Sequence, residues 1–323
     1  MYLINNEHLQ PSFNLALEEY LLKTLKLPCI MLWRNSKAII IGCNQNAFAE
    51  IDREYVEQNN IPVIRRQTGG GAVYHDLGNI NYTIISNSVN NIGNYEVFSA
   101  DLCDYLESLG VNARLSGRND ILIDNKKICG NAQSVNKNMM IHHGCILFDT
   151  DLSVLAKSLK ANNLKIESKG IKSVRSRVAN IKEFLPEYTV EDFLNRFKDF
   201  IISKYSPEIY EFTKHDIDCV NNLVFEKYGK FEWNYGQSPK SNIVKTLKFD
   251  FGLMTIYLVV EKGIITSIKI CGDFFSKREI LYLEEKIINA KYDFNTIKSI
   301  LSNIDIQDYI IGASCEDLLK ILF

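Results

Sequence analysis

The stretch Arg65–Asp76 reads Arg-Arg-Gln-Thr-Gly-Gly-Gly-Ala-Val-Tyr-His-Asp. Three consecutive glycines lack side chains, so the backbone there can adopt unusual dihedral angles and bring its N–H groups close to an anion. The stretch is flanked by the apolar segment Ile61–Ile64 and the alternating segment Ile80–Ile85, which are both typical of β-strands. The pattern predicts a loop between strands that binds phosphate or carboxylate. The alternative is a β-hairpin whose turn simply requires glycine.

The composition is that of a globular protein with room for two domains. The chain has 323 residues, of which 46% are hydrophobic, against a typical domain size of ~150 residues. Lys and Arg number 37 and Asp and Glu 39, giving a net charge of −2, which argues against nucleic acid or an anionic membrane as a partner. No leader-like N-terminus and no apolar run near ~20 residues is found, so we expect a cytoplasmic protein.

The eight cysteines are dispersed singly along the chain, without a Cys-x-x-Cys pair. This spacing favours reduced, mostly buried thiols over a disulfide framework or a structural zinc site.

Hydrophobic periodicity predicts helices and short strands in alternation before residue 205. We expect helices at 13–22, 51–59, 97–109, 152–159 and 190–205. We expect strands at 30–33, 38–42, 61–64, 80–85, 120–124, 127–133 and 139–148, the first two forming an antiparallel pair across a polar turn. Residues from 206 to 230 are predicted to be irregular. The resulting sheet is expected to be mixed or antiparallel.

The character of the sequence changes after Pro239. A β-hairpin is predicted from residues 249–260 and 264–270, followed by helices at 278–290, 295–302 and 314–319. We therefore expect two domains, at residues 1–240 and 241–323, the second being a small α/β unit.

A second candidate site follows the glycine-rich stretch. Ser116–Asp120 precedes Lys127 by seven residues, and Lys127 is followed by the small residues Gly130 and Ala132. A lysine in such a strand can direct an ammonium into a cleft that binds carboxylate or phosphate, and Asp120 is a candidate magnesium ligand. The alternatives are a solvated lysine and an aspartate that belongs to a turn. The glycine-rich stretch itself lacks a Walker A ending, and it precedes a strand rather than a Rossmann helix.

These motifs resemble, in order and across essentially the whole chain, the bacterial lipoate–protein ligases. The motifs that carry the resemblance are Trp33-Arg34-Asn35, the glycine-rich stretch with His75-Asp76, Gly78-Asn79, Ser116–Asp120, Lys127-Ile128-x-Gly130-x-Ala132, His142-His143-Gly144, 169–177 and Glu232–Gly236. The resemblance implies a mixed-sheet α/β (α+β) catalytic domain of the biotin/lipoate ligase fold with a small C-terminal domain.

The resemblance also implies the reaction. Such enzymes use ATP and Mg²⁺ to convert lipoate to lipoyl-AMP with release of pyrophosphate. They then transfer the lipoyl group to a lysine of an acceptor lipoyl domain, in 2-oxoacid dehydrogenase complexes or the glycine cleavage H protein. A monomer is expected.

Carried over residue by residue, the resemblance implies a role for Lys127 between the lipoyl carboxylate and the α-phosphate. The other residues expected at the ATP or lipoyl-AMP site are Arg66, Gly69, Gly70, Gly71, Ala72, Val73, Tyr74, His75, Asn79, Asp120, Gly130 and Ala132. The expected lipoate pocket consists of Trp33, Gly70, His75 and His143.

Two positions depart from the family pattern, and one segment adds charge. Cys129 stands where serine is common, and Ser134 stands where a relative has an arginine near the intermediate. Residues 165–182 hold six basic residues against one acidic residue. This segment is a candidate for binding pyrophosphate or an acidic acceptor domain.

Two alternatives remain open from the sequence. An octanoyl or lipoyl transferase of the same fold uses a cysteine nucleophile and no ATP, but the cysteine positions of those enzymes are not matched here. A non-catalytic relative that only binds a cofactor is the third reading, and the intact Lys127 argues against it.

Overall fold

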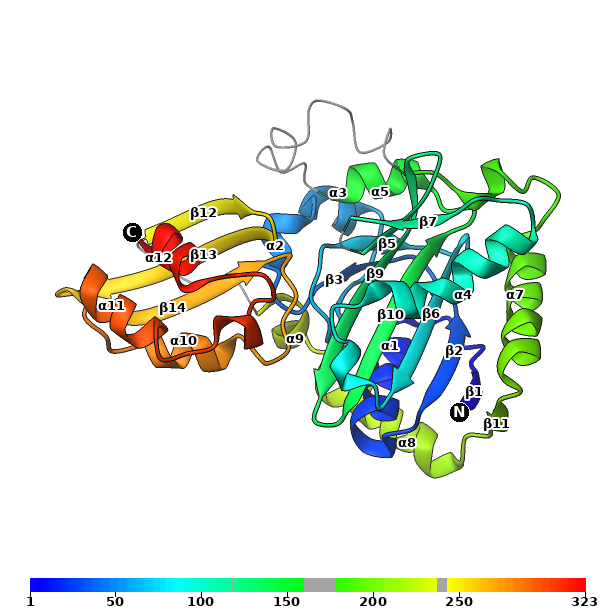
Figure 1. Ribbon diagram of the computed structural model, residues 1–323, viewed down its shortest axis with the longest axis horizontal. Coiled ribbons are helices and arrows are strands. Elements are labelled where there is room, and N and C mark those ends of the chain that lie inside the picture. The colour runs from blue at the N-terminus through cyan, green and yellow to red at the C-terminus, as the bar shows by residue number, and fades with distance from the viewer. Residues whose placement is uncertain (118, 160–177, 237–242) are drawn as a thin grey trace.

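The computed structural model describes residues 1–117, 119–159, 178–236 and 243–323, arranged as a larger and a smaller α/β unit (Figure 1). The basic segment at 165–182 lies mostly outside the described residues, as does the motif at 169–177. No helix in the described part of the chain is long and apolar enough to cross a membrane. All eight cysteines carry free thiols.

A mixed sheet of eight strands forms the centre of the larger unit, as the sequence predicts. Its first three strands are parallel and the remaining pairs are antiparallel. In spatial order the strands are β11 (Glu208–Tyr210), β1 (Tyr2–Asn5), β2 (Cys29–Trp33), β6 (Asn79–Ser86), β10 (Met139–Leu147), β9 (Lys126–Asn136), β8 (Asp120–Ile123) and β7 (Arg114–Ser116).

A second, three-stranded sheet carries the glycine-rich stretch. Its central strand is β3 (Ala38–Ile41), which pairs in parallel with β4 (Val63–Arg65) and antiparallel with β5 (Val73–His75). Because β4 and β5 flank β3 instead of pairing with each other, the glycine loop between them is not a hairpin turn.

The two faces of the large sheet are covered by different elements. One face packs on α4 (Tyr95–Ser108) and α7 (Val190–Tyr205). The other packs on α1 (Pro11–Glu19), α8 (Lys214–Leu223) and part of the small sheet. The remaining helices of the larger unit are α2 (Ala47–Glu50), α3 (Arg53–Gln58), α5 (Leu152–Ser158) and α9 (Phe231–Tyr235), with π-helical turns at Tyr20–Leu25 and Val224–Tyr228 and 3₁₀ turns at Val89–Asn91 and Ile181–Glu183.

The predicted pairing of residues 30–33 with 38–42 is wrong. Both segments are strands, but β2 belongs to the large sheet and β3 to the small one. The connection between them is held by the N-terminal region, because Ser36 donates its N–H to Leu9 and the Asn14 amide binds the Arg34 carbonyl. These contacts turn the chain away from β2 before it can form a hairpin.

Two further expectations need correction. The helix expected at 51–59 is two short helices, because Ile51 pairs with Leu159 and the Asp52 carboxylate caps the start of α3. The region from 206 to 230 is not irregular and contains α8, whose start is a capping box of Thr213 and Asp216. That capping box was a readable signal in the sequence.

The smaller unit has its own core of apolar side chains beneath an antiparallel sheet. Its strands are β12 (Ile243–Phe249), β13 (Gly252–Glu261) and β14 (Ile264–Gly272), one more than predicted, since β12 precedes the expected hairpin. Its helices are α10 (Leu281–Ile287), α11 (Phe294–Leu301) and α12 (Cys315–Leu322), with a 3₁₀ turn at Ile306–Asp308, close to the expected positions.

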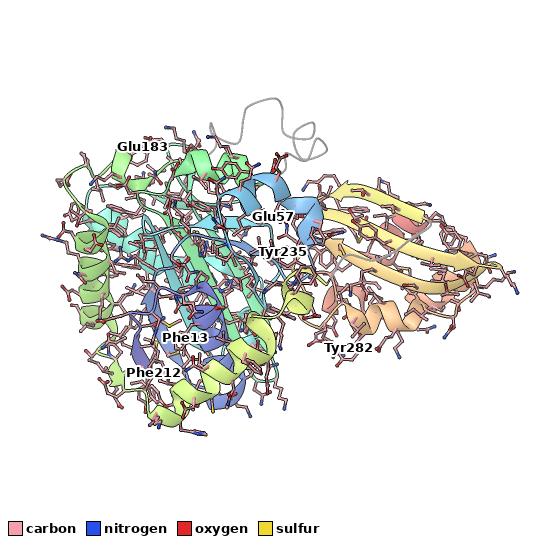
Figure 2. The ribbon with its side chains drawn as sticks, turned by 180° about the vertical axis from the view of Figure 1, so that it is seen from behind. Phe13, Glu57, Glu183, Phe212, Tyr235 and Tyr282 are labelled. Atoms are coloured by element: carbon pink, nitrogen blue, oxygen red, sulfur yellow. The ribbon has the colours of Figure 1, made fainter. Side chains whose placement is uncertain are left out.

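The smaller unit docks directly on the glycine loop. Gly70 donates its N–H to the Phe274 carbonyl at 3.4 Å, and the Gly272 N–H binds the Asn44 carbonyl at 2.8 Å. Phe275 is buried against Tyr95 and Ala132 of the larger unit. Seen from behind, the larger unit carries Phe13 and the smaller one Tyr282, with Tyr235 between them in this view (Figure 2).

Close backbone approach makes this docking sensitive to one glycine. A Cβ on Gly69 would lie 2.4 Å from the Phe274 carbonyl oxygen, whereas a Cβ on Gly71 would meet nothing within 4 Å. We therefore expect Gly69→Ala to loosen the docked unit, measured as faster hydrogen exchange in residues 272–275. Gly71→Ala is the matched control and should exchange as the wild type does. Equal exchange in the two variants would contradict this account of the contact.

Candidate active site

A cavity of about 130 Å³ lies between the large sheet and the glycine loop. It includes most of the residues that the sequence predicts for the site, which are Trp33, Arg66, Gly70, Gly71, Ala72, Val73, His75, Lys127, Gly130, Ala132 and His143. Residues that the sequence did not single out as site residues also line it, namely Leu15, Ile40, Asn81, Asn119, Asn131, Gly144 and Cys145.

Four of the predicted residues do not line this cavity. Gly69 packs on Phe274, and Tyr74 is buried in the core beside β3. Asn79 directs its amide toward Cys145 and the Ile146 carbonyl. Asp120 binds Lys127 from the side.

The floor of the cavity is one row of residues across four neighbouring strands. Asn81 on β6 is in register with Trp33 on β2 and with Cys145 on β10, and Cys145 is in register with Gly130 on β9. Side chains of directly opposed residues point to the same face of a sheet. Asn81 and Thr83 alternate with apolar residues along β6, so a polar face of this strand was visible in the sequence.

Lys127 reaches this face because of a β-bulge. The pairing of β8 with β9 slips between Ile121 and Leu122, so that Leu122 opposes Lys127. In a regular strand Lys127 and Gly130 would point to opposite faces, but here Ile128 and Cys129 both enter the core and the Lys127 side chain folds over Gly130. A Cβ on Gly130 would lie 2.6 Å from Lys127 Nζ, which explains why this position has no side chain.

The Lys127 ammonium is held by one carboxylate. Its Nζ lies 2.7 Å from Asp120 Oδ1, and both side chains are about one-third exposed, at 32% and 37%. The pair therefore sits at the open side of the cavity, where the ammonium can exchange a protein carboxylate for a substrate anion.

The glycine loop is held in shape from inside by Arg66. Its guanidinium donates to the carbonyls of Gly69 at 2.6 Å and Gly71 at 2.9 Å, and to Thr68 Oγ1 at 2.9 Å. Gly70 has a φ of 91°, a left-handed conformation that favours glycine. Burial lowers the pKa of Arg66 to about 10, so the group stays charged at neutral pH.

Arg65 faces away from the cavity. Its buried guanidinium donates to five carbonyls, those of Gly42, Cys43, Gln45, Trp233 and Asn234. The two adjacent arginines therefore have separate environments, and of the two Arg66 lines the cavity.

A buried hydrogen-bonded chain connects the loop to Trp33. Thr68 Oγ1 lies 2.8 Å from His143 Nε2, and His143 Nδ1 lies 2.9 Å from a Glu18 carboxylate oxygen. The same carboxylate accepts from Thr83 Oγ1 at 2.6 Å, and Trp33 Nε1 donates to Thr83. The Glu18 carboxylate is thus satisfied inside the protein, and Trp33 is fixed in orientation.

His75 is a neutral histidine with a defined tautomer. Asn35 Oδ1 accepts from Asn14 Nδ2 at 2.8 Å, so the amide nitrogen of Asn35 faces His75 Nδ1 at 3.0 Å and donates to it. The proton of His75 is therefore assigned to Nε2. Desolvation by burial, with the nearby Arg66 charge, lowers the pKa of His75 to about 3.

The described residues do not form a preorganised magnesium site. No cluster of three or more His, Cys, Asp or Glu side chains that could hold a metal ion is found among them. Asp120, the predicted ligand, binds Lys127. A magnesium ion at Asp120 would therefore depend largely on oxygen ligands from phosphate and water.

The geometry suits a protein that binds a small acid, with an ammonium at the open end of a slot and a glycine loop beside it. The family model of the lipoyl protein ligase A/B catalytic domain matches residues 10–202 of the sequence. The family model of the bacterial lipoate protein ligase C-terminus matches residues 238–322. The chain belongs to the lipoate–protein ligase family.

Relatives match over the whole chain. The chain is 39% identical to lipoate-protein ligase LplJ of Bacillus subtilis, with 100% of both proteins covered. It is also 39% identical to lipoate–protein ligase 1 of Staphylococcus aureus, with 99% of both covered.

Solved structures agree on the fold. LipL1 of P. falciparum in complex with lipoate superposes with a TM-score of 0.80 at 24% identity, over 99% of this chain and 97% of that one. A lipoate-protein ligase A bound with ATP superposes with a TM-score of 0.63 at 27% identity, over 73% of this chain and 98% of that one. A bi-partite lipoate protein ligase of Thermoplasma acidophilum, studied with its E2 lipoyl domain, superposes with a TM-score of 0.65 at 30% identity, over 75% of this chain and 98% of that one.

The neutral state of His75 predicts a pH dependence of stability. Because its folded pKa lies near 3 and its unfolded pKa near 6.5, the unfolded state binds more protons between these values, and the free energy of unfolding rises with pH across that window. Between about pH 5 and pH 7 this amounts to about 2 kcal/mol.

His75→Gln should remove that part of the pH dependence. Denaturant unfolding at the two pH values measures it, with the wild type as the reference. An unchanged pH dependence in the variant would mean that His75 is not held neutral.

Proposed function

We propose that this chain joins lipoate to ATP, releases pyrophosphate, and transfers the lipoyl group from lipoyl-AMP to a lysine of an acceptor lipoyl domain. The observation that carries the proposal is the position of the Lys127 ammonium. A β-bulge places it at the open end of the slot, and Trp33 lies at the other end. A carboxylate with an apolar tail fits such a slot. Relatives named as ligases, and a related structure bound with ATP, support the same reaction.

The first step brings two anions together. The lipoate carboxylate oxygen attacks the α-phosphorus of ATP, and the bond to the β,γ-pyrophosphate breaks. Fixed positive charge and oriented N–H groups are the main contribution that a protein can make to such a step. Lys127 provides the charge between the two reacting groups, and the glycine loop, shaped by Arg66, provides backbone N–H groups.

The second step uses the same lysine differently. The acceptor amine attacks the acyl carbon, and AMP leaves with the electrons of the broken acyl–phosphate bond. An ammonium beside the acyl oxygen stabilises the negative charge that develops there. No protein nucleophile is required.

The state of the two cysteines near the cavity argues against the transferase alternative. Burial raises the pKa of Cys129 well above its usual value, and burial raises the pKa of Cys145 to about 11. Both thiols are therefore protonated at neutral pH, whereas a catalytic cysteine needs its thiolate.

Further assignments rest on the family. We propose that the acceptors are lipoyl domains of 2-oxoacid dehydrogenase complexes or the glycine cleavage H protein, that the enzyme is a cytoplasmic monomer, and that the domains divide near residue 240. The Thermoplasma acidophilum ligase studied with its E2 lipoyl domain supports a lipoyl domain as the partner.

The function is tested with purified protein, lipoate, ATP and magnesium. We expect lipoyl-AMP and pyrophosphate, measured by mass spectrometry and a coupled phosphate assay. A transferase or a non-catalytic binder would form neither product, and that result would refute the proposal.

Lys127→Ala should lower the rate of adenylate formation by about 10³-fold, because the other cation that lines the cavity, Arg66, donates to Thr68 and to the carbonyls of the glycine loop. Its neighbour provides the matched control: Lys126 is 45% exposed and pairs with Glu183, away from the cavity. Lys126→Ala should retain wild-type turnover. Similar losses in both variants would contradict the assigned role of Lys127.

A further inference from the structure

Two buried N–H donors of the cavity lack a protein partner among the described residues. They are Nδ2 of Asn81 and Nε2 of His75. Asn81 is 2% exposed and His75 is 4% exposed, and both residues line the cavity. A buried donor without an acceptor destabilises the fold, so two such donors beside a substrate slot indicate a ligand that satisfies them.

Both unpartnered nitrogen atoms are hydrogen-bond donors. The Asn14–Asn35 pair directs an amide N–H at His75 Nδ1, which leaves the imidazole proton on Nε2. The amide nitrogen of Asn81 can only donate. The slot therefore presents two neutral N–H donors at these positions, with the Asn81 Oδ1 beside one of them.

The donors lie at the end of the slot opposite the lysine. Asn81 is the direct cross-strand neighbour of Trp33, and the His75 ring centroid lies 6.4 Å from that of Trp33. Gly130, over which the Lys127 ammonium folds, is two strands away from Asn81, a distance of about 10 Å. An acid whose carboxylate meets Lys127 therefore directs the far end of its chain at Asn81 and His75.

We propose that Asn81 and His75 select the sulfur-containing ring of lipoate over a hydrocarbon tail, which makes them specificity-determining residues of this site. The inference rests on the proposed function. Sulfur lone pairs are weak hydrogen-bond acceptors, whereas methylene groups accept nothing. A straight fatty acyl chain would expel water from the slot and leave both donors unpaired, and the dithiolane ring would pair them.

The experiment compares three acids on the full-length wild-type enzyme with ATP and magnesium. They are lipoate, octanoate, and 5-cyclopentylpentanoate, which has the ring shape of lipoate without sulfur. Acyl-AMP formation gives kcat/KM for each. We expect lipoate to be preferred over the cyclopentyl acid by at least about tenfold, which is 1.4 kcal/mol. Equal use of these two acids overturns the inference, because ring shape alone would then explain binding.

Variants of Asn81 assign the effect to this residue. Asn81→Leu removes the donor at similar volume, and the ratio of lipoate to cyclopentyl acid should fall several-fold toward one. Asn81→Thr restores a donor and should recover most of the preference. Asn81→Ala, a second variant without the donor, guards against a folding defect in the leucine variant.

The outcomes separate this inference from the function on which it rests. If the wild type forms acyl-AMP with none of the acids, the proposed function itself fails. If acyl-AMP forms and the selectivity ratio of Asn81→Leu and Asn81→Ala equals that of the wild type, the function stands and the role of Asn81 is refuted.

Discussion

The buried guanidinium of Arg65 is the interaction on which the rest of the site depends. It donates to carbonyls of the turn at residues 42–45 and of α9, which are far apart in the sequence. In the opposite direction, the Trp233 indole N–H donates to the Arg65 carbonyl. Hydrogen bonds from a charged donor are about twice as strong as neutral ones. They therefore fix the end of β4, where the glycine loop begins.

From that fixed strand, the site is built by two backbone irregularities. One is the left-handed Gly70, which lets the loop curl around the Arg66 guanidinium. The other is the bulge in β9, which brings Lys127 to the same face as Gly130. Both irregularities lie beside the cavity, and bulges and left-handed residues are common near active sites.

The interior of the site is polar but almost fully satisfied. Glu18, His143, Thr68 and Arg66 form a continuous hydrogen-bonded chain behind the cavity. Such networks hold side chains in one arrangement when every member has a partner. The unpaired donors of Asn81 and His75 contrast with this background, and they occur where a substrate would lie.

The sequence by itself determined the mixed α/β character, most helices and strands and the glycine loop, because these depend on local periodicity and on residue types at fixed spacing. The role of Lys127 was predicted from the resemblance to the lipoate–protein ligases, because spacing alone left a solvated lysine as an alternative. The sequence did not predict which strands pair with each other. The segments of β2 and β3 have the pattern of a hairpin, but they lie in different sheets, and Leu9 and Asn14 hold the connection between them.

The roles of the two arginines were likewise decided by tertiary structure. Arg65 is the last residue of β4 and Arg66 follows it directly, yet the Arg65 guanidinium meets the carbonyls of residues 42–45 and α9 while that of Arg66 meets the glycine loop. The face on which Lys127 lies depends on a bulge that strand periodicity does not reveal. The proton position of His75 depends on Asn14 and Asn35, which are distant in sequence and meet only in the folded chain.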